Sequence, residues 1–81
     1  MDTRAEMMRR LQAALPDARI TLNDMTGGGD HWEGEIVSAS FAGQPRLARY
    51  RAVYAALGDM MPVQVHAFTF KALTPAEAAG D

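Results

Sequence analysis

Two histidines are the side chains of this sequence best suited to binding a transition metal. His31 follows the triple glycine Gly27–Gly29 and opens a strand-like segment, and His66 opens another. Neutral imidazole nitrogen is a good ligand for zinc, copper and iron. The chain contains no cysteine, so it offers these two imidazoles and no thiolate. Because two ligands do not close a metal site, we expect any metal bound here to take its remaining ligands from a partner.

Each of these features also has a simpler interpretation. A single histidine at a strand end is more often a solvated or hydrogen-bonded residue than a metal ligand. The glycines fit a flexible hairpin loop, and they lack the Gly-Lys-Ser/Thr ending of a phosphate-binding P-loop. From the residues alone, both interpretations of the histidines stay open.

Length and composition predict one folded domain over residues 1–81. Hydrophobic residues make up 48% of the chain and charged residues 22%, values that are ordinary for a globular protein. No apolar run approaches the roughly 20 residues that a membrane span needs, and the N-terminus does not resemble a signal peptide. With no cysteine either, we expect a cytoplasmic protein. The net charge of -2 argues against a protein whose main task is binding nucleic acid phosphates.

The first part of the chain predicts a helix followed by a β-hairpin. Thr3 and Glu6 have the spacing of a capping box, so a helix is expected to start there and to stop at Pro16. Arg19–Asp24 and His31–Ser38 alternate apolar and polar side chains, a pattern that is typical of half-buried strands. The glycine-rich loop connects these two strands.

The second part predicts a longer helix and a third strand. Pro45 is placed to be the first helical residue, and the helix is expected to end near Gly58. Its expected apolar stripe consists of Leu47, Tyr50, Val53, Tyr54, Leu57 and Met60 or Met61. Val65–Lys71 reads as a strand. Thr74–Glu77 has the pattern of a cap for one further turn, but residues 74–81 are expected to be a frayed tail.

The resulting order is α-β-β-α-β, an α+β domain with helices on one face of a three-stranded mixed sheet. A helical crossover normally joins parallel strands of one sheet, so the second and third strands are expected to be parallel. If they are neighbours, their axes lie about 4.8 Å apart and both start at the same end of the sheet. His31 and His66 would then share that end.

Strand alternation creates one difficulty for this arrangement. In a regular strand His66 lies on the face of Phe68 and Phe70, whereas His31 lies opposite Trp32. The histidines therefore converge only if the glycine loop bends back, which glycine permits. On this reasoning His31 is expected to be mobile in the free protein and His66 to be held by its strand.

At this point a resemblance to a known family adds to the residue patterns. The segments that carry it are Ala13–Ala18, Thr26–Glu33, Phe41–Gly43, Arg49–Leu57, Val65–Lys71 and Leu73–Pro75. In this order and spacing they resemble the BolA family over nearly the whole chain. The resemblance implies an α-β-β-α-β fold similar to class II KH domains.

The resemblance also implies a partner and a cofactor. BolA-like proteins pair with monothiol glutaredoxins and share a [2Fe-2S] cluster with them in iron-sulfur trafficking and iron regulation, and some are described as transcriptional regulators. The glutaredoxin side gives a cysteine and a bound glutathione, and the BolA side would give His31 and His66. The isolated chain is expected to be a monomer without a cluster.

This sequence departs from the family pattern at particular positions. Pro45 stands where serine is frequent, and Tyr50 stands where histidine is frequent, so a third histidine is not available here. Gly34 stands where a β-branched residue is usual, which is expected to loosen the second strand.

The alternative function is nucleic-acid binding through the KH-like shape. Arg46, Arg49, Arg51 and Lys71 are the residues that would contact phosphates, in a short and split patch. The Gly-x-x-Gly loop with which KH domains grip nucleic acid is missing, so only weak DNA binding is expected. An enzyme is not expected, because the sequence shows neither an acid and base pair at a motif spacing nor a nucleophilic cysteine.

Overall fold

The structure is a computed structural model that describes residues 2–80. Its elements are α1 (Thr3–Ala14), β1 (Arg19–Asp24), β2 (His31–Val37), η1 (Ala39–Phe41), α2 (Arg46–Leu57), η2 (Gly58–Met60), β3 (Ala67–Leu73) and α3 (Pro75–Ala78). The predicted α-β-β-α-β order is confirmed, with two 3-10 turns and a short helix added. No helix in this part of the chain is both long and apolar enough to cross a membrane.

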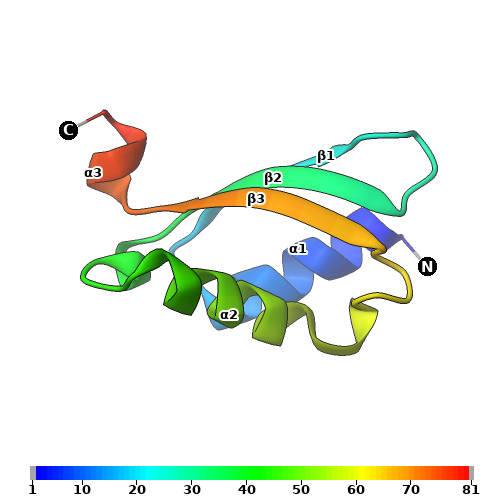
Figure 1. Ribbon diagram of the computed structural model, residues 1–81, viewed down its shortest axis with the longest axis horizontal. Coiled ribbons are helices and arrows are strands. Elements are labelled where there is room, and N and C mark those ends of the chain that lie inside the picture. Colours follow the sequence, from blue (N-terminus) through cyan, green and yellow to red (C-terminus); the bar gives the residue numbers. More distant parts are fainter. Residues whose placement is uncertain (1, 81) are drawn as a thin grey trace.

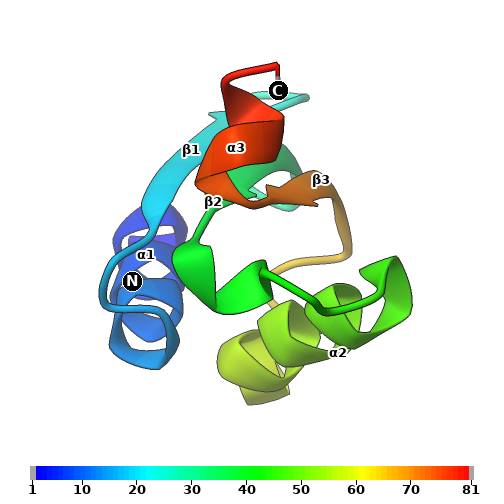
Figure 2. The same cartoon turned by 90° about the vertical axis from the view of Figure 1, so that its left-hand side faces the viewer.

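The three strands form one mixed sheet in the order β1-β2-β3. β1 and β2 are antiparallel, and β2 and β3 are parallel, as the helical crossover predicted. The two long helices α1 and α2 lie beneath one face of the sheet (Figure 1). α3 lies on the other side of the sheet (Figure 2).

The core fills the layer between the sheet and the two long helices. The predicted inward face of β2 is confirmed, because Trp32 and Ile36 are buried. They belong to one cluster whose largest members also include Met7, Leu11, Phe41, Val53, Leu57, Met60, Phe68 and Phe70. Two members of the stripe predicted for α2 do not join it, since Leu47 is 58% exposed and Tyr54 42% exposed. Tyr54 instead lies at the sheet edge, where its hydroxyl donates to the Phe68 carbonyl at 3.2 Å.

The helix ends differ from the predictions by single residues. Asp2, not Thr3, is the N-cap of α1, and its Oδ1 accepts from the Ala5 amide at 3.2 Å. An aspartate caps as well as a threonine and also favours the positive helix N-terminus. Pro45 is the N-cap of α2 and not its first helical residue.

The C-terminal segment is a short helix and not the frayed tail that was expected. Thr74 and Glu77 form a complete capping box with Pro75 as the first helical residue of α3. The two helix-start signals expected at α1 and α2, a capping box and a proline at the first helical position, occur together here. Asp81 lies outside the described residues.

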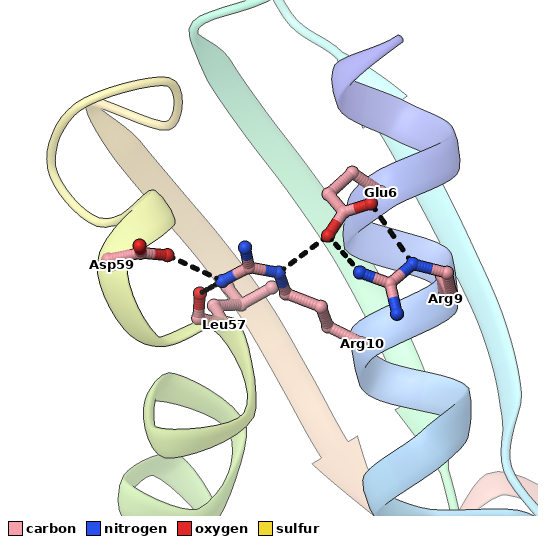
Figure 3. Close-up of polar contacts among 5 residues, drawn as sticks. All are labelled: Glu6, Arg9, Arg10, Leu57 and Asp59. Atoms are coloured by element: carbon pink, nitrogen blue, oxygen red, sulfur yellow. Dashed lines mark hydrogen bonds and ion pairs between the residues drawn. The ribbon is translucent and has the colours of Figure 1, made fainter. Parts of the chain in front are cut away.

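A cluster of charged side chains connects α1 to the end of α2 (Figure 3). Arg10 Nη1 donates to the Leu57 carbonyl and to Asp59 Oδ1, each at 2.7 Å. Its Nε donates to Glu6 Oε2 at 2.8 Å, and Glu6 also pairs with Arg9. The two guanidinium groups, that of Arg9 first, lower the pKa of Glu6 to about 2. Arg10 thus satisfies a carbonyl at a helix C-terminus and fixes the two helices relative to each other.

β2 runs through Gly34 without interruption. Gly34 pairs with Leu22 of β1 and Phe70 of β3, at the centre of the sheet. A Cβ atom added there would lie 2.5 Å from the Thr21 carbonyl oxygen and 3.2 Å from Phe68 Cε1. The expected loosening of the strand is therefore not seen, because neighbouring groups fill the space of the missing side chain.

We predict that Glu6→Gln makes the protein less stable at neutral pH but not in acid. A carboxyl with a lowered folded-state pKa stabilises the fold above its unfolded pKa near 4.5, and this contribution is lost as the pH falls towards 2. Melting temperatures of parent and variant should differ at pH 7 and converge between about pH 4.5 and pH 2. Glu33→Gln, on the exposed sheet face, is the control. A Glu6→Gln difference that is equally large at pH 2 would contradict the ion-pair argument.

We also predict that Gly34→Ala destabilises the domain by about 1 to 3 kcal/mol, the usual cost of overpacking. Urea unfolding followed by circular dichroism measures this change. Thr69→Ala, on the exposed face of β3, should change stability by no more than about 0.5 kcal/mol. A Gly34→Ala variant with the same free energy of unfolding as the parent would show that the centre of the sheet can relax around the added methyl group.

Candidate metal centre

The parallel register of β2 and β3 brings the two histidines together. His31 pairs with Ala67, so His66, one residue before β3, lies at the same end of the sheet. The two ring centroids are 6.1 Å apart, with the ring planes at 67°. The two candidate ligands are therefore neighbours, as the predicted crossover required.

The difficulty with strand alternation disappears because β3 starts later than predicted. It spans Ala67–Leu73 and not Val65–Lys71, so His66 lies outside the strand and is not bound by its alternation. The His66 amide donates to the Asp30 carbonyl at 2.8 Å, and the Ala67 amide donates to the same oxygen at 3.3 Å. The histidines converge without the glycine loop having to bend back.

The loop before His31 is held by its own hydrogen bonds. Asp24 Oδ1 accepts from the Gly27 amide at 3.0 Å, and Thr26 Oγ1 accepts from the Gly28 amide at 3.1 Å. The indole of Trp32 donates to the Gly29 carbonyl at 3.0 Å. Positive φ angles of 78° and 77° at Gly27 and Gly29 explain the need for glycine at these two positions.

His31 itself is the first residue of β2, and its carbonyl accepts from the Met25 amide at 2.8 Å. The reason for expecting a mobile His31 and a fixed His66 is therefore removed. The strand holds the backbone of His31, and the bond to Asp30 holds that of His66.

Both imidazoles are accessible, and a carboxylate lies beside them. The side chain of His31 is 47% exposed and that of His66 is 59% exposed. Asp30 Oδ1 is 3.0 Å from His31 Nδ1, and Asp30 Oδ2 is 3.9 Å from His66 Nδ1. The imidazole of His31 lowers the pKa of Asp30. Sequence reasoning did not select Asp30, although its position directly before His31 was the available signal.

Within residues 2–80, no group of three or more histidine, aspartate or glutamate side chains is arranged to hold a metal ion. The site therefore offers two accessible imidazole nitrogens, with a carboxylate beside them. This arrangement is suited to a metal centre that is completed by ligands from another molecule.

Three of the four residues of the predicted nucleic-acid patch line one surface hollow, but one of these three is hydrogen-bonded within the fold. Arg49, with a side chain only 12% exposed, donates to the Ala72 carbonyl at 2.9 Å and to Glu77 Oε1 at 2.6 Å. The Arg49 guanidinium lowers the pKa of Glu77 to about 2. Arg46 and Lys71 line the same surface hollow beside this pair, and Arg51 is exposed but is not part of the lining. Arg49 thus connects α2 to the end of β3 and to α3, while its expected role as a phosphate contact stays a prediction.

Comparison with known proteins gives one consistent result. The family model described as BolA-like protein matches residues 9–77. Human BolA-like protein 2 is 37% identical over 78 residues, covering 93% of this chain and 90% of its own length. BolA1 from Arabidopsis thaliana superposes with a TM-score of 0.87 at 26% identity, covering 95% of this chain and 96% of that one. A Bol-like protein from Babesia bovis has a TM-score of 0.79 at 36% identity, covering 95% and 92%.

We predict that Arg49→Gln lowers stability, while Arg51→Gln does not. The first variant leaves the Ala72 carbonyl with a weaker donor or none, and a lost hydrogen bond of about 1 kcal/mol lowers the melting temperature of a small domain by about 4 to 8 °C. Differential scanning calorimetry measures this change. We expect only non-specific DNA binding by the parent and by both variants, with an affinity for duplex DNA no tighter than about 1 μM at physiological salt. Nanomolar binding to a defined site, lost in Arg51→Gln, would contradict this.

Proposed function

The chain belongs to the BolA family, and from this membership and the histidine pair we propose that it shares a bridging [2Fe-2S] cluster with a monothiol glutaredoxin. The proposed role is iron-sulfur trafficking or iron regulation in the cytoplasm. In this role the protein is a binding partner and not an enzyme.

The observation that carries the proposal is the pairing of two accessible imidazoles at one end of the sheet, 6.1 Å apart between ring centroids. [2Fe-2S] centres with two histidine and two cysteine ligands are known, so this donor set fits such a cluster. The chain has no cysteine to supply the thiolates. A glutaredoxin cysteine and its bound glutathione would supply them, which fits the partner that the family resemblance implies.

The surroundings of the histidines also suit a partner. Met25, whose amide bonds the His31 carbonyl, is 58% exposed, and Val63, three residues before His66, is 67% exposed. Contiguous exposed apolar surface rimmed by polar residues marks interaction sites, and under this proposal Met25 and Val63 contribute to such a surface. His31 and His66 would bind the iron, and the apolar residues would contact the partner.

The alternative, a KH-like transcriptional regulator, has less support. Arg49 is engaged with Ala72 and Glu77, which leaves Arg46, Arg51 and Lys71 as exposed cations on a chain of net charge -2. Salt dependence separates the two functions, because phosphate binding weakens steeply with salt.

We predict that the chain alone binds no stable cluster and that the chain together with a monothiol glutaredoxin binds one. Reconstitution with glutathione, iron and sulfide should leave the isolated chain colourless. The mixture with glutaredoxin should give a heterodimer with visible [2Fe-2S] absorption. His31→Ala and His66→Ala should each remove this absorption or speed its loss by about tenfold or more, because both ligand backbones are held in place.

Glu33→Ala, an exposed position on the same strand, is the control and should behave like the parent. Circular dichroism checks that every variant folds. A stoichiometric chromophore on the isolated chain would contradict completion by a partner. Parent-like cluster lifetimes in both histidine variants would contradict the ligand assignment.

A further inference from the structure

Asp30 contacts both histidine segments at once. Its carboxylate lies 3.0 Å from His31 Nδ1 and 3.9 Å from His66 Nδ1. Its backbone carbonyl accepts the His66 amide at 2.8 Å and the Ala67 amide at 3.3 Å. One residue therefore holds the segment of one histidine and faces the ring of the other.

We propose that Asp30 is a positioning residue for this pair: its carboxylate fixes the proton of His31 on Nδ1, so that Nε2 is the nitrogen left free to bind iron. The inference rests on the proposed function for the identity of the metal. The tautomer itself is a property of the free chain.

The chemistry follows from the two nitrogens of imidazole. In the neutral ring one nitrogen carries the proton and the other a lone pair, and the partner of the first decides which one is free. Oδ1 of Asp30 lies within hydrogen-bonding distance of His31 Nδ1. A carboxylate oxygen can only accept a hydrogen bond, so Nδ1 must carry the proton for this bond to form. A carboxylate beside a histidine ligand in this way orients the ring and strengthens its bond to the metal.

The glycine loop provides the support for Asp30. Thr26 Oγ1 donates to Asp30 Oδ1 at 3.3 Å and accepts from the Gly28 amide at 3.1 Å. Asp24 in turn accepts from the Gly27 amide at 3.0 Å. The loop thus forms a chain of contacts that ends on the oxygen facing His31. This gives Thr26–Gly29 a role beyond that of a hairpin connection.

Asp30 is assigned to positioning and not to iron ligation. Its oxygens face the Nδ1 atoms of both rings, whereas a ligand to the same iron would lie on the side of the free nitrogens. The described residues also contain no group of three such side chains with the arrangement of a metal site.

The test uses three substitutions in the full chain. Asp30→Ala removes the acceptor. Asp30→Asn keeps an oxygen acceptor without the charge. Thr26→Val removes both hydrogen bonds of Thr26 Oγ1, to Asp30 and to the Gly28 amide, but leaves the carboxylate. All three retain the backbone carbonyl of Asp30, so the sheet end is expected to form, and circular dichroism checks this.

The first measurement is the histidine tautomer in the free chain, by long-range proton–nitrogen NMR at about pH 8.5, where an imidazole of ordinary pKa is neutral. His31 should carry its proton on Nδ1 in the parent and in Asp30→Asn, and should shift towards the Nε2-protonated form in Asp30→Ala. Thr26→Val should keep the parent tautomer. Protonation of His31 on Nε2 in the parent, or the same tautomer in parent and Asp30→Ala, would overturn the proposal.

The second measurement is the rate of cluster loss with glutaredoxin. Asp30→Ala should lose the cluster about 10 to 100 times faster than the parent, with a smaller effect for Asp30→Asn. Equal rates in parent and Asp30→Ala would overturn the positioning role even if the tautomer changes. If the parent itself forms no cluster with glutaredoxin, the proposed function fails, while the tautomer measurement still decides what Asp30 does.

Discussion

Parallel pairing of β2 with β3 is the constraint on which the rest of the structure depends. The two strands are joined through α2, and the crossover connection places that helix against the same face as α1. The register that pairs His31 with Ala67 sets where both segments begin. A shift of one residue would turn the inward side chains of β3 outward and would separate His66 from Asp30. The inward face of β3 and the position of the histidine pair thus both follow from the pairing of β2 with β3.

Arginine side chains form hydrogen bonds between elements of the domain near both ends of α2. Arg10 reaches from α1 to the carbonyl of Leu57, and Arg49 reaches from α2 to the carbonyl of Ala72. Each guanidinium also pairs with a carboxylate, Asp59 or Glu77. A chain of 81 residues buries a limited apolar area, so such charge-assisted bonds between elements add to a modest core.

The candidate site combines a fixed backbone with exposed rings. The carbonyl of His31 and the amide of His66 are both hydrogen-bonded, while the imidazoles remain about half exposed. Two preorganised nitrogens at a surface lose little conformational freedom on binding but cannot satisfy a metal alone. The proposed cluster therefore depends on the ligands that the partner supplies.

The sequence by itself determined the fold class and the order of the elements, because the alternation in the first two strands and the spacing of Met7 and Leu11 are local signals of burial. It also determined that the chain offers two imidazoles as candidate metal ligands and no thiolate. Only the tertiary structure decided that β3 begins at Ala67. His66 therefore lies outside the strand, and strand alternation does not fix the direction of its side chain. The Asp30 contacts likewise depend on segments 36 residues apart that the sheet brings together. The pairing of Arg49 with Glu77 depends on where α3 lies at the end of β3, and no local pattern encodes such a long-range contact.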